Sequence, residues 1–365
     1  MIRTLKNLIV GIMAAFIHDK EARQKFRNKY KTKSKFRKLR DDNIKILNDI
    51  ERINKELHTL REDYNQHLWE WERINSLTFH VKPLDDSPPQ GPDEDVFLAI
   101  TCVAKNEGPY LKEWIEYHKI VGVERFYLYD NESDDNTKEV LAPYIKDGTV
   151  VYHFLPNHPI TKQFPQIEAF NDAIFKYRDR TTWMALIDAD EFIVPIEKSS
   201  IPEFLEEYAQ YPGVAINWVC FDSSGHEKKP TAHGGLLTAN YTRVRKDHSN
   251  RRDRTVKSIV NPKQVIFYPS SHYGLYYLNL ESVTEKFQRT RGMASKFHSS
   301  SKIRINHYES KSREEYLNKI LRNSKGHTPA INFREGLLNF QEETTVDLVI
   351  QKYVPKLKLA MGIKD

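Results

Sequence analysis

Cysteine is scarce in this sequence. Its 365 residues include only two, Cys102 and Cys220, and both lie in apolar runs that predict strands. A disulfide framework, or a zinc site built from cysteines, needs more thiols than this. The sequence therefore argues against both and fits a protein of the reducing cytoplasm.

Long apolar runs and nucleotide-binding glycine motifs are also missing. The apolar run at residues 8–17 has ten residues, against about 20 that are needed to cross a bilayer. No clear small-residue cleavage site follows Ala14 and Ala15, which argues against a signal peptide. No Gly-x-Gly-x-x-Gly follows the first expected strand and no P-loop occurs, so a dinucleotide oxidoreductase or a Walker-type nucleotidase is disfavoured.

Positive charge is concentrated at one end of the chain. Residues 1–40 hold thirteen Lys or Arg against two acids, a net of +11, while the whole chain carries +6. Apolar residues from Ile2 to Phe16 recur about once per helical turn, which predicts an amphipathic helix. We interpret residues 1–40 as a peripheral anchor on the anionic inner face of the cell membrane. Nucleic-acid binding is the alternative, but no recognised nucleic-acid-binding fold accompanies these charges.

A heptad pattern follows the basic segment. Between Ile46 and Ile74 the apolar positions alternate in steps of four and three, which predicts a coiled-coil helix within residues 41–80. This helix could pair two chains or fold back on its own chain. Residues 81–95 contain Pro88-Pro89-Gln90-Gly91-Pro92 and predict a linker.

Strands and helices alternate in residues 96–330. The expected strands are 96–103, 125–129, 149–154 and 182–187, and helices are expected from Pro109, through Val140 and Leu141, and over 166–177. This alternation predicts an α/β domain with a mostly parallel sheet that helices cover on both faces, followed by a helical segment, 331–365. Ligands bind at the carboxyl ends of such strands. Three polar clusters follow strand ends: Lys105-Asn106-Glu107, Asp130 to Asp135, and Asp188 to Glu191.

The third cluster points most directly to chemistry. Asp188 and Asp190 lie two residues apart at the end of a buried strand, where side chains two apart share a face. Two unneutralised carboxylates on one side repel each other unless a cation lies between them, so we expect a divalent metal. The alternative is a solvated turn with capping side chains.

Several motifs together resemble a known family. They are Lys105-Asn106-Glu107, Tyr110-Leu111-x-Glu113-Trp114-Ile115-Glu116-Tyr117-His118, Gly122-Val123-Glu124-x-Phe126-Tyr127-Leu128-Tyr129-Asp130-Asn131, Asp188-Ala189-Asp190-Glu191-Phe192, Trp218-x-x-Phe221-x-Ser223-Ser224-Gly225, Asn306-His307-Tyr308, Lys311-Ser312 and Lys319. The set is similar to glycosyltransferase family 92 and the related family-2-like proteins. The resemblance implies a GT-A fold and transfer of a sugar from a nucleotide-sugar donor, usually with Mn²⁺ or Mg²⁺.

The resemblance and the chemistry suggest roles for individual residues. Asp190 is expected to bind the metal, and Asp188 the ribose or the metal through water. His307 is expected as a further metal ligand in preference to His272. The resemblance implies that Asp130 reads the base edge of a uridine-type nucleotide, that Lys105, Asn106 and Glu107 line the same pocket, and that Asn131 also binds the donor. The alternative is a strand-end turn or cap, above all for Glu107. Lys257 and the basic loop of Arg251, Arg252 and Arg254 could clamp the diphosphate, although a solvated charge run is the simpler interpretation of that loop.

An acceptor hydroxyl needs a general base if the sugar inverts by direct displacement. Asp222 and Glu191 are the candidates, although Asp222 could be loop variation and Glu191 a capping residue. The sequence thus predicts a metal-dependent, membrane-associated glycosyltransferase that acts on a saccharide or glycolipid acceptor in surface polysaccharide synthesis. A nucleotidyltransferase, a sugar-nucleotide hydrolase and a non-catalytic coiled-coil scaffold are the alternatives.

Overall fold

The computed structural model describes residues 19–29, 44–45, 48–49, 52–53, 56, 84, 87–156, 165–248, 250–324 and 335–364. The chain divides into two compact units, Met1–Asn75 and Ser76–Asp365. In the first unit, α2 (Lys20–Lys29) is helical, and so are the described residues between 44 and 56. The predicted anchor and coiled coil otherwise lie outside the described residues. No helix within the described ranges is long and apolar enough to cross a membrane.

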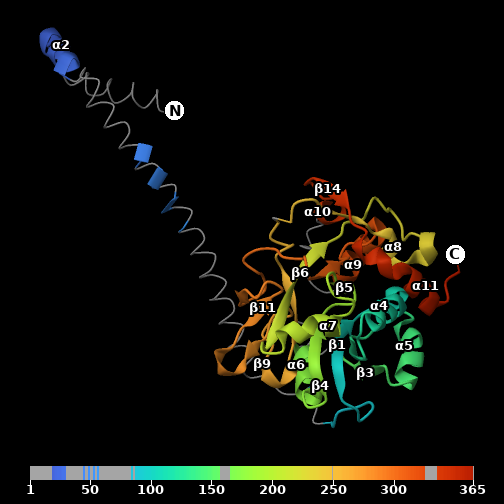
Figure 1. Ribbon diagram of the computed structural model, residues 1–365. Helices are drawn as coiled ribbons and strands as arrows, with labels where there is room; N and C mark the ends of the chain where they lie inside the picture. Colours follow the sequence, from blue (N-terminus) through green and yellow to red (C-terminus); the bar gives the residue numbers. More distant parts are fainter. Residues whose placement is uncertain are drawn as a thin grey trace. The chain divides into compact units, whose positions relative to one another are not determined.

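A ten-stranded sheet forms the centre of the second unit (Figure 1). Its strands are β1 (Val96–Ala104), β2 (Arg125–Asp130), β3 (Val150–Phe154), β4 (Thr181–Leu186), β5 (Glu191–Pro195), β6 (Gly213–Cys220), β8 (Val256–Val260), β11 (Ser282–Thr284), β12 (Arg289–Thr290) and β13 (Ile303–His307). The order is β12-β11-β6-β8-β4-β1-β2-β3, and β13 pairs with β6 and β5. Two small sheets join β9 (Val265–Phe267) to β10 (Leu275–Tyr276) and β7 (Arg243–Arg245) to β14 (Thr344–Val346).

The helices connect and cover these strands. They are α4 (Gly108–Ile120), α5 (Thr137–Lys146), α6 (Pro165–Tyr177), α7 (Ile201–Leu205), α8 (Leu237–Asn240), α9 (Arg313–Ser324), α10 (Glu335–Leu338) and α11 (Val354–Met361). Short 3-10 turns are η1 (Glu206–Tyr208), η2 (Ala232–Gly235), η3 (Pro262–Gln264), η4 (Tyr277–Asn279) and η5 (Val349–Tyr353). The expected strands and helices of residues 96–187 are all present within one or two residues of their predicted bounds.

The strands β3, β2, β1 and β4 are parallel neighbours. Val103 of β1 lies opposite Tyr129 of β2, and Thr101 lies opposite Leu186 of β4. Their carboxyl ends therefore meet at one edge of the sheet, and the three polar clusters follow three of these ends. The predicted α/β class, with a mostly parallel sheet, is confirmed.

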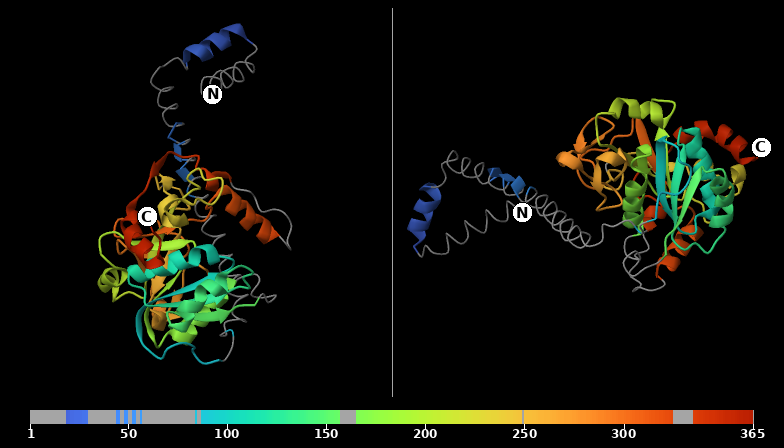
Figure 2. Two further views of the ribbon diagram at one scale, coloured as in Figure 1. Left: turned by 90° about the vertical axis from the view of Figure 1, so that its right-hand side faces the viewer. Right: turned by 90° about the horizontal axis from the view of Figure 1, so that it is seen from below.

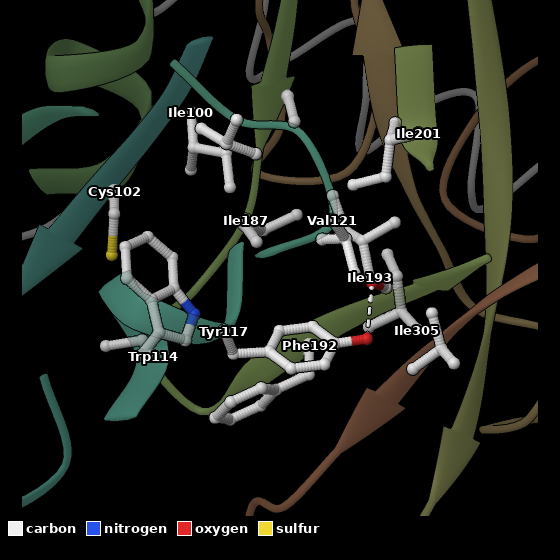
Figure 3. Packing of buried hydrophobic residues seen from close by; sticks show 14 of the residues in the cluster. Ile100, Cys102, Trp114, Tyr117, Val121, Ile187, Phe192, Ile193, Ile201 and Ile305 are labelled. Atoms are coloured by element: carbon white, nitrogen blue, oxygen red, sulfur yellow. Dashed lines mark hydrogen bonds between the residues drawn. The ribbon is translucent and has the colours of Figure 1, made fainter. Parts of the chain in front are cut away.

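Helix α4 covers one face of the sheet and holds β5 in place. Trp114 is fully buried, and its Nε1 donates to the carbonyl oxygen of Glu191 at 2.7 Å. The hydroxyl of Tyr117 donates to the carbonyl oxygen of Ile193 at 3.0 Å, the bond drawn in Figure 3. Burial of two aromatic side chains with their polar ends satisfied fixes the strand that begins at Glu191.

Helix α6 covers the opposite face, so helices cover both faces as predicted. Tyr177 stacks on Tyr127 of β2 with ring centroids 3.8 Å apart. The hydroxyl of Tyr129 donates to Asp172 at 2.7 Å. The helix begins at the carboxyl side of β3, so Gln166 in its first turn comes close to the polar edge of the sheet.

The C-terminal segment packs into the same core. Helix α11 lies beside α4 in Figures 1 and 2, and Leu357 is fully buried. Lys112 of α4 donates to the carbonyl oxygen of Met361 at 3.1 Å. Residues 331–365 were expected to be helical, but the described part, 335–364, also supplies β14, because Thr345 pairs with Val244.

Candidate active site

The two aspartates lie in a turn between β4 and β5. β4 ends at Leu186, so Asp188 and Asp190 are not in the strand, and the expected alternation of side chains does not apply to them. The turn is closed because the amide of Glu191 donates to the carbonyl oxygen of Asp188 at 3.1 Å, and the Glu191 carboxylate accepts the Asp188 amide at 2.9 Å. Both aspartates line a cavity of about 200 Å³. The described residues that line it are Val103, Lys105, Glu107, Gln166, Asp188, Ala189, Asp190 and Lys319.

The Asp188 side chain has two partners among the residues that the structure describes. Gln166 Nε2 donates to its Oδ1 at 2.5 Å, and Lys257 Nζ lies 3.1 Å from its Oδ2. Lys257 projects from β8 and its side chain is only 1% exposed. Burial alone would lower the pKa of this amine, but Asp188 and Glu191 raise it above its usual value. Lys257 is therefore a buried cation beside the turn.

Asp190 is buried and has partners of its own. Lys319 Nζ of α9 lies 3.0 Å from its Oδ2, and His307 Nε2 of β13 lies 3.5 Å from its Oδ1. Burial alone would raise the pKa of Asp190, but Lys319 and His307 hold it well below its usual range. The premise that the two carboxylates are unneutralised is therefore wrong, because a lysine pairs with each one.

His307 is the better placed of the two histidine candidates. It lies opposite Glu191 in the β13–β5 pairing, and its ring packs at a tilt against Trp218 with centroids 4.2 Å apart. Burial lowers its pKa although Asp190 opposes the shift. Its Nδ1 has no hydrogen-bond partner in the described part of the chain. His272 instead lies 3.0 Å from the carbonyl oxygen of Val256 through Nδ1, and burial lowers its pKa to about 4.

The two candidate bases lie in different surroundings. Glu191 is fully buried, and burial raises its pKa well above the usual value, with Asp188 adding to the effect and Lys257 opposing it. Its Oε1 has no partner among the residues that the structure describes. Asp222 is also buried, but Arg243 Nε contacts both its oxygens, at 2.9 and 2.7 Å. Asp222 is not among the residues that line the cavity.

The first polar cluster forms one wall of the cavity. Lys105 and Glu107 line it, and Lys311 Nζ contacts Glu107 at 2.6 Å. Asn106 has a left-handed backbone with φ of 57°. Its Nδ2 donates to Asp134 at 2.5 Å and its Oδ1 accepts the Asp134 amide at 2.8 Å. The first and second polar clusters are thus joined.

Asp130 and Asn131 lie at the end of β2, next to the first polar cluster. Asp130 lies opposite Ala104, directly before Lys105. Its carboxylate accepts the amide of Ser133 and the hydroxyl of Tyr152, both at 2.9 Å. Asn131 Nδ2 donates to the carbonyl oxygen of Leu155 at 3.1 Å. These contacts fix the loop after β2 beside the cavity.

The basic loop has contacts of its own. Arg252 pairs with Glu309, and Arg254 donates to the carbonyl oxygen of Lys296 at 3.3 Å, while Arg251 is exposed. None of the three lines the cavity. Their action on a diphosphate stays a prediction.

Some residues of the site had no role assigned from the sequence. Lys319 belongs to the quoted motifs, but nothing in its neighbourhood in the sequence points to Asp190. Gln166 carries no motif, and its only signal is its position in the first helical turn after a strand end. Lys311 donates a hydrogen bond to Glu107, which lines the cavity, although the two residues are 204 positions apart in the sequence.

The residues partly fit a divalent cation. Two carboxylates and a neutral imidazole suit Mn²⁺ or Mg²⁺, but the described residues contain no ready cluster of three such ligands. Lys319 pairs with Asp190 Oδ2 while His307 lies nearest Oδ1, so a metal held by Asp190 would compete with the Lys319 ammonium for this carboxylate. Since the Lys319 side chain is 34% exposed, it can move aside more easily than Lys257.

Known proteins share this sequence pattern. A profile of glycosyltransferase family 92 matches residues 99–335. A glycosyltransferase family 92 protein of Oryza sativa subsp. japonica is 28% identical over 215 residues, which cover 58% of this chain and 33% of that protein. The galactan beta-1,4-galactosyltransferase GALS3 of Arabidopsis thaliana is 30% identical over 214 residues, which cover 52% of this chain and 41% of that protein. The chain therefore spans less than half the length of these two relatives.

Solved structures give weaker likenesses. S. aureus TarS 1–349 is 13% identical with a TM-score of 0.33, over 62% of this chain and 65% of that chain. The mannosyltransferase PcManGT from Pyrobaculum calidifontis, in complex with GDP-Man and Mn²⁺, is 17% identical with a TM-score of 0.26, over 41% of this chain and 42% of that chain. Both scores are too low to support an argument.

The family match bears directly on the resemblance that the motifs suggested. It covers more than half of the chain and includes the turn of Asp188 and Asp190, the imidazole of His307 and Lys319 of α9. The chain belongs to glycosyltransferase family 92.

Proposed function

We propose that the protein transfers a sugar from a nucleoside-diphosphate sugar, a uridine diphosphate sugar in particular, to a hydroxyl of a saccharide or glycolipid. The observation that carries this proposal is the cavity at the carboxyl ends of β1 and β4, where Asp188 and Asp190 lie with Lys105 and Lys319. Acidic and basic groups at one sheet edge suit a ligand that brings both a diphosphate and a cation. The galactosyltransferase activity in the name of the Arabidopsis relative supports a sugar as the transferred group.

The proposal includes Mn²⁺ or Mg²⁺. Asp188, Asp190 and His307 are the residues that would hold it. When bound, the cation would neutralise negative charge that develops on the leaving diphosphate.

The protein's own cations contribute to the same stabilisation. Lys257 is fixed between Asp188 and Glu191, at 3.1 and 4.0 Å, so it keeps positive charge close to the turn. Fixed charge in a site with little water stabilises a transition state without reorganisation. We propose that Lys257 and Lys105 orient the diphosphate, while Glu107, Asn106, Asp130 and Asn131 form the wall beside the nucleoside.

Of the two candidate bases we favour Glu191 as the proton acceptor. It adjoins the turn, and α4 holds its backbone through Trp114. Neither carboxylate is among the described residues that line the cavity, but Asp222 is held through both oxygens by Arg243 and is the weaker candidate.

The N-terminal part carries separate proposals. The net charge of +11 in residues 1–40 supports attachment to an anionic membrane surface, which for a cytoplasmic protein is the inner face of the cell membrane. The heptad pattern supports pairing of two chains. Synthesis of surface polysaccharide or glycolipid at that membrane is the process we propose.

The test is thermal unfolding with a panel of nucleotides and nucleotide sugars, each with and without Mn²⁺. A ligand that binds only the folded state stabilises it by about 2.7 kcal/mol at a hundredfold excess over its Kd. We expect uridine nucleotides with Mn²⁺ to give the largest shift, and Asp190→Ala to lose the Mn²⁺-dependent part.

Product analysis separates the alternatives. Sugar joined to an acceptor supports transfer, while free sugar formed without an acceptor supports a hydrolase. If no nucleotide shifts the thermal unfolding transition, the non-catalytic coiled-coil scaffold is favoured.

A further inference from the structure

Lys319 is a cation that lines the cavity, contacts a proposed metal ligand and remains partly open to solvent. Its Nζ lies 3.0 Å from Asp190 Oδ2 and 3.4 Å from the carbonyl oxygen of Glu309. Its side chain is 34% exposed, whereas the Lys257 side chain is 1% exposed. The Lys319 amine can therefore leave its carboxylate for another anion in the cavity, and the Lys257 amine is confined.

The helix that carries Lys319 is anchored independently of the Lys319–Asp190 contact. Just before α9, Lys311 pairs with Glu107 at 2.6 Å. Within the first turn, Glu315 accepts the hydroxyl of Tyr241 at 3.1 Å and that of Ser312 at 2.6 Å. These contacts hold the backbone in place, so a change of side-chain rotamer is enough to move the amine.

Charge balance shows why such a movement matters. Asp188 and Asp190 bring two negative charges to the turn, and Lys257 and Lys319 bring two positive charges. A divalent cation that approaches Asp190 meets an ammonium 3.0 Å from one oxygen of this carboxylate, and a diphosphate that approaches alone meets two carboxylates. Both conflicts are relieved if the ammonium moves from Asp190 to the diphosphate while the cation takes its place.

We propose that Lys319 is an exchangeable counter-ion. It pairs with Asp190 when no donor is bound, competes there with the divalent cation, and binds the diphosphate of the donor after the exchange. This rests on the proposed function, and it makes metal and diphosphate binding mutually favourable through one side chain. A residue that only held α9 against the sheet would have no such effect.

The test compares Lys319→Met with Lys319→Arg and a matched control, Lys302→Met. Lys302 pairs with Glu207 at 2.9 Å, close to the 3.0 Å of the Lys319 pair, and is not among the cavity-lining residues. Three quantities are measured by calorimetry on the full chain: the Kd of Mn²⁺ alone, the Kd of uridine diphosphate without metal, and the factor by which each ligand tightens the other.

Lys319→Met should move the two affinities in opposite directions. We expect Mn²⁺ to bind about tenfold more tightly, because its competitor is gone, and metal-free uridine diphosphate about tenfold more weakly, because a cation is lost. The factor by which each ligand tightens the binding of the other should become smaller. In Lys319→Arg, which keeps the charge, all three quantities should stay near their wild-type values. In Lys302→Met all three should equal those of wild type.

Other results would overturn the inference. If folded Lys319→Met binds both ligands more weakly, or binds Mn²⁺ as wild type does, Lys319 does not compete with the cation and the exchange is rejected. If Lys319→Met does not fold, the charge-keeping Lys319→Arg decides, since a change of its two affinities in the same direction also rejects the exchange. If wild type binds uridine diphosphate but no Mn²⁺ under any condition, the metal dependence of the proposed function fails as well. In that case, a loss of metal-free diphosphate affinity in Lys319→Met would still show that Lys319 contacts the diphosphate.

Discussion

Lys257 Nζ lies 3.1 Å from Oδ2 of Asp188 in surroundings that exclude nearly all water from the amine. Lys257→Met would leave the carboxylates of the turn without this cation. Removing one partner of a buried ion pair costs about 3–5 kcal/mol, and since Asp188 is 24% exposed we expect a smaller loss of about 1–3 kcal/mol. Urea unfolding measures it, and the affinity for uridine diphosphate should fall in the same variant.

The control for that experiment is Lys246→Met. Lys246 pairs with Glu343 at 2.8 Å, but both side chains are largely exposed, so its loss should cost well under about 1 kcal/mol. Equal losses in the two variants would contradict a special role for the buried Lys257.

The two candidate bases can be separated by matched amides. Glu191→Gln keeps the size of the side chain and removes its ability to accept a proton, so we expect kcat to fall by about 10²–10⁴ with little change in KM. Asp222→Asn breaks the pair with Arg243 and should lower the stability by about 1–3 kcal/mol while the folded fraction keeps its kcat. Steady-state rates with an acceptor identified by product analysis, together with urea unfolding, measure both. A large fall in kcat for Asp222→Asn at full stability would reverse the assignment.

The basic N-terminal segment is tested by membrane binding. Deletion of residues 1–40 should release the protein from anionic vesicles at low salt, because each surface cation contributes about 1 kcal/mol of attraction. The deletion variant should still transfer sugar to a soluble acceptor. Liposome flotation of the full chain and the deletion variant decides this, with neutral vesicles as the control. Full-length protein that stays at the bottom of the gradient with anionic vesicles would rule out the anchor.

The sequence contained enough to predict the fold between residues 96 and 187. Apolar runs of strand length alternate there with helical patterns, and Pro109 stands in the first turn of α4. These signals depend only on residues that are close together in the sequence, so they can be recognised without knowledge of the tertiary contacts. The polar clusters could be assigned to one site as well, because the carboxyl ends of parallel strands must meet at one edge.

The electrostatics of the site could not be predicted in the same way. Lys319 is 129 positions from Asp190 in the sequence, and only the fold brings the two together. The same holds for Lys257 and Asp188, and for Arg243 and Asp222. Strand alternation failed at Asp188 and Asp190 because β4 ends at Leu186, one residue before the predicted end of the strand, and a turn follows. Contacts between distant residues therefore decide which carboxylates are neutralised.

His118 gives a prediction about acid stability. It is fully buried, its Nε2 accepts the amide of Ile193 at 3.2 Å, and Nδ1 lies 2.8 Å from the carbonyl oxygen of Trp114, so the ring is neutral with its proton on Nδ1. Tyr117 and Phe192 pack against it. Burial lowers its pKa to about 3.

The direction of the pH effect follows from that shift. In the unfolded chain the imidazole takes up a proton below a pKa of about 6.5, while in the folded protein it stays neutral down to about 3. Acid therefore favours the unfolded state, and the contribution of His118 to stability is complete above pH 6.5 and declines as the pH falls from 6.5 toward 3. At pH 5 the loss relative to pH 8 should be about 2 kcal/mol from this residue.

Urea unfolding at pH 8 and pH 5 measures this loss, with His118→Gln as the variant. Glutamine can donate and accept hydrogen bonds but does not titrate, so whatever its stability at pH 8 the variant should lose about 2 kcal/mol less than wild type on going to pH 5. His233→Gln is the control, because His233 is exposed and its replacement should leave the pH dependence of wild type unchanged. An equal decline in wild type and His118→Gln would show that the buried imidazole is not what makes the fold sensitive to acid.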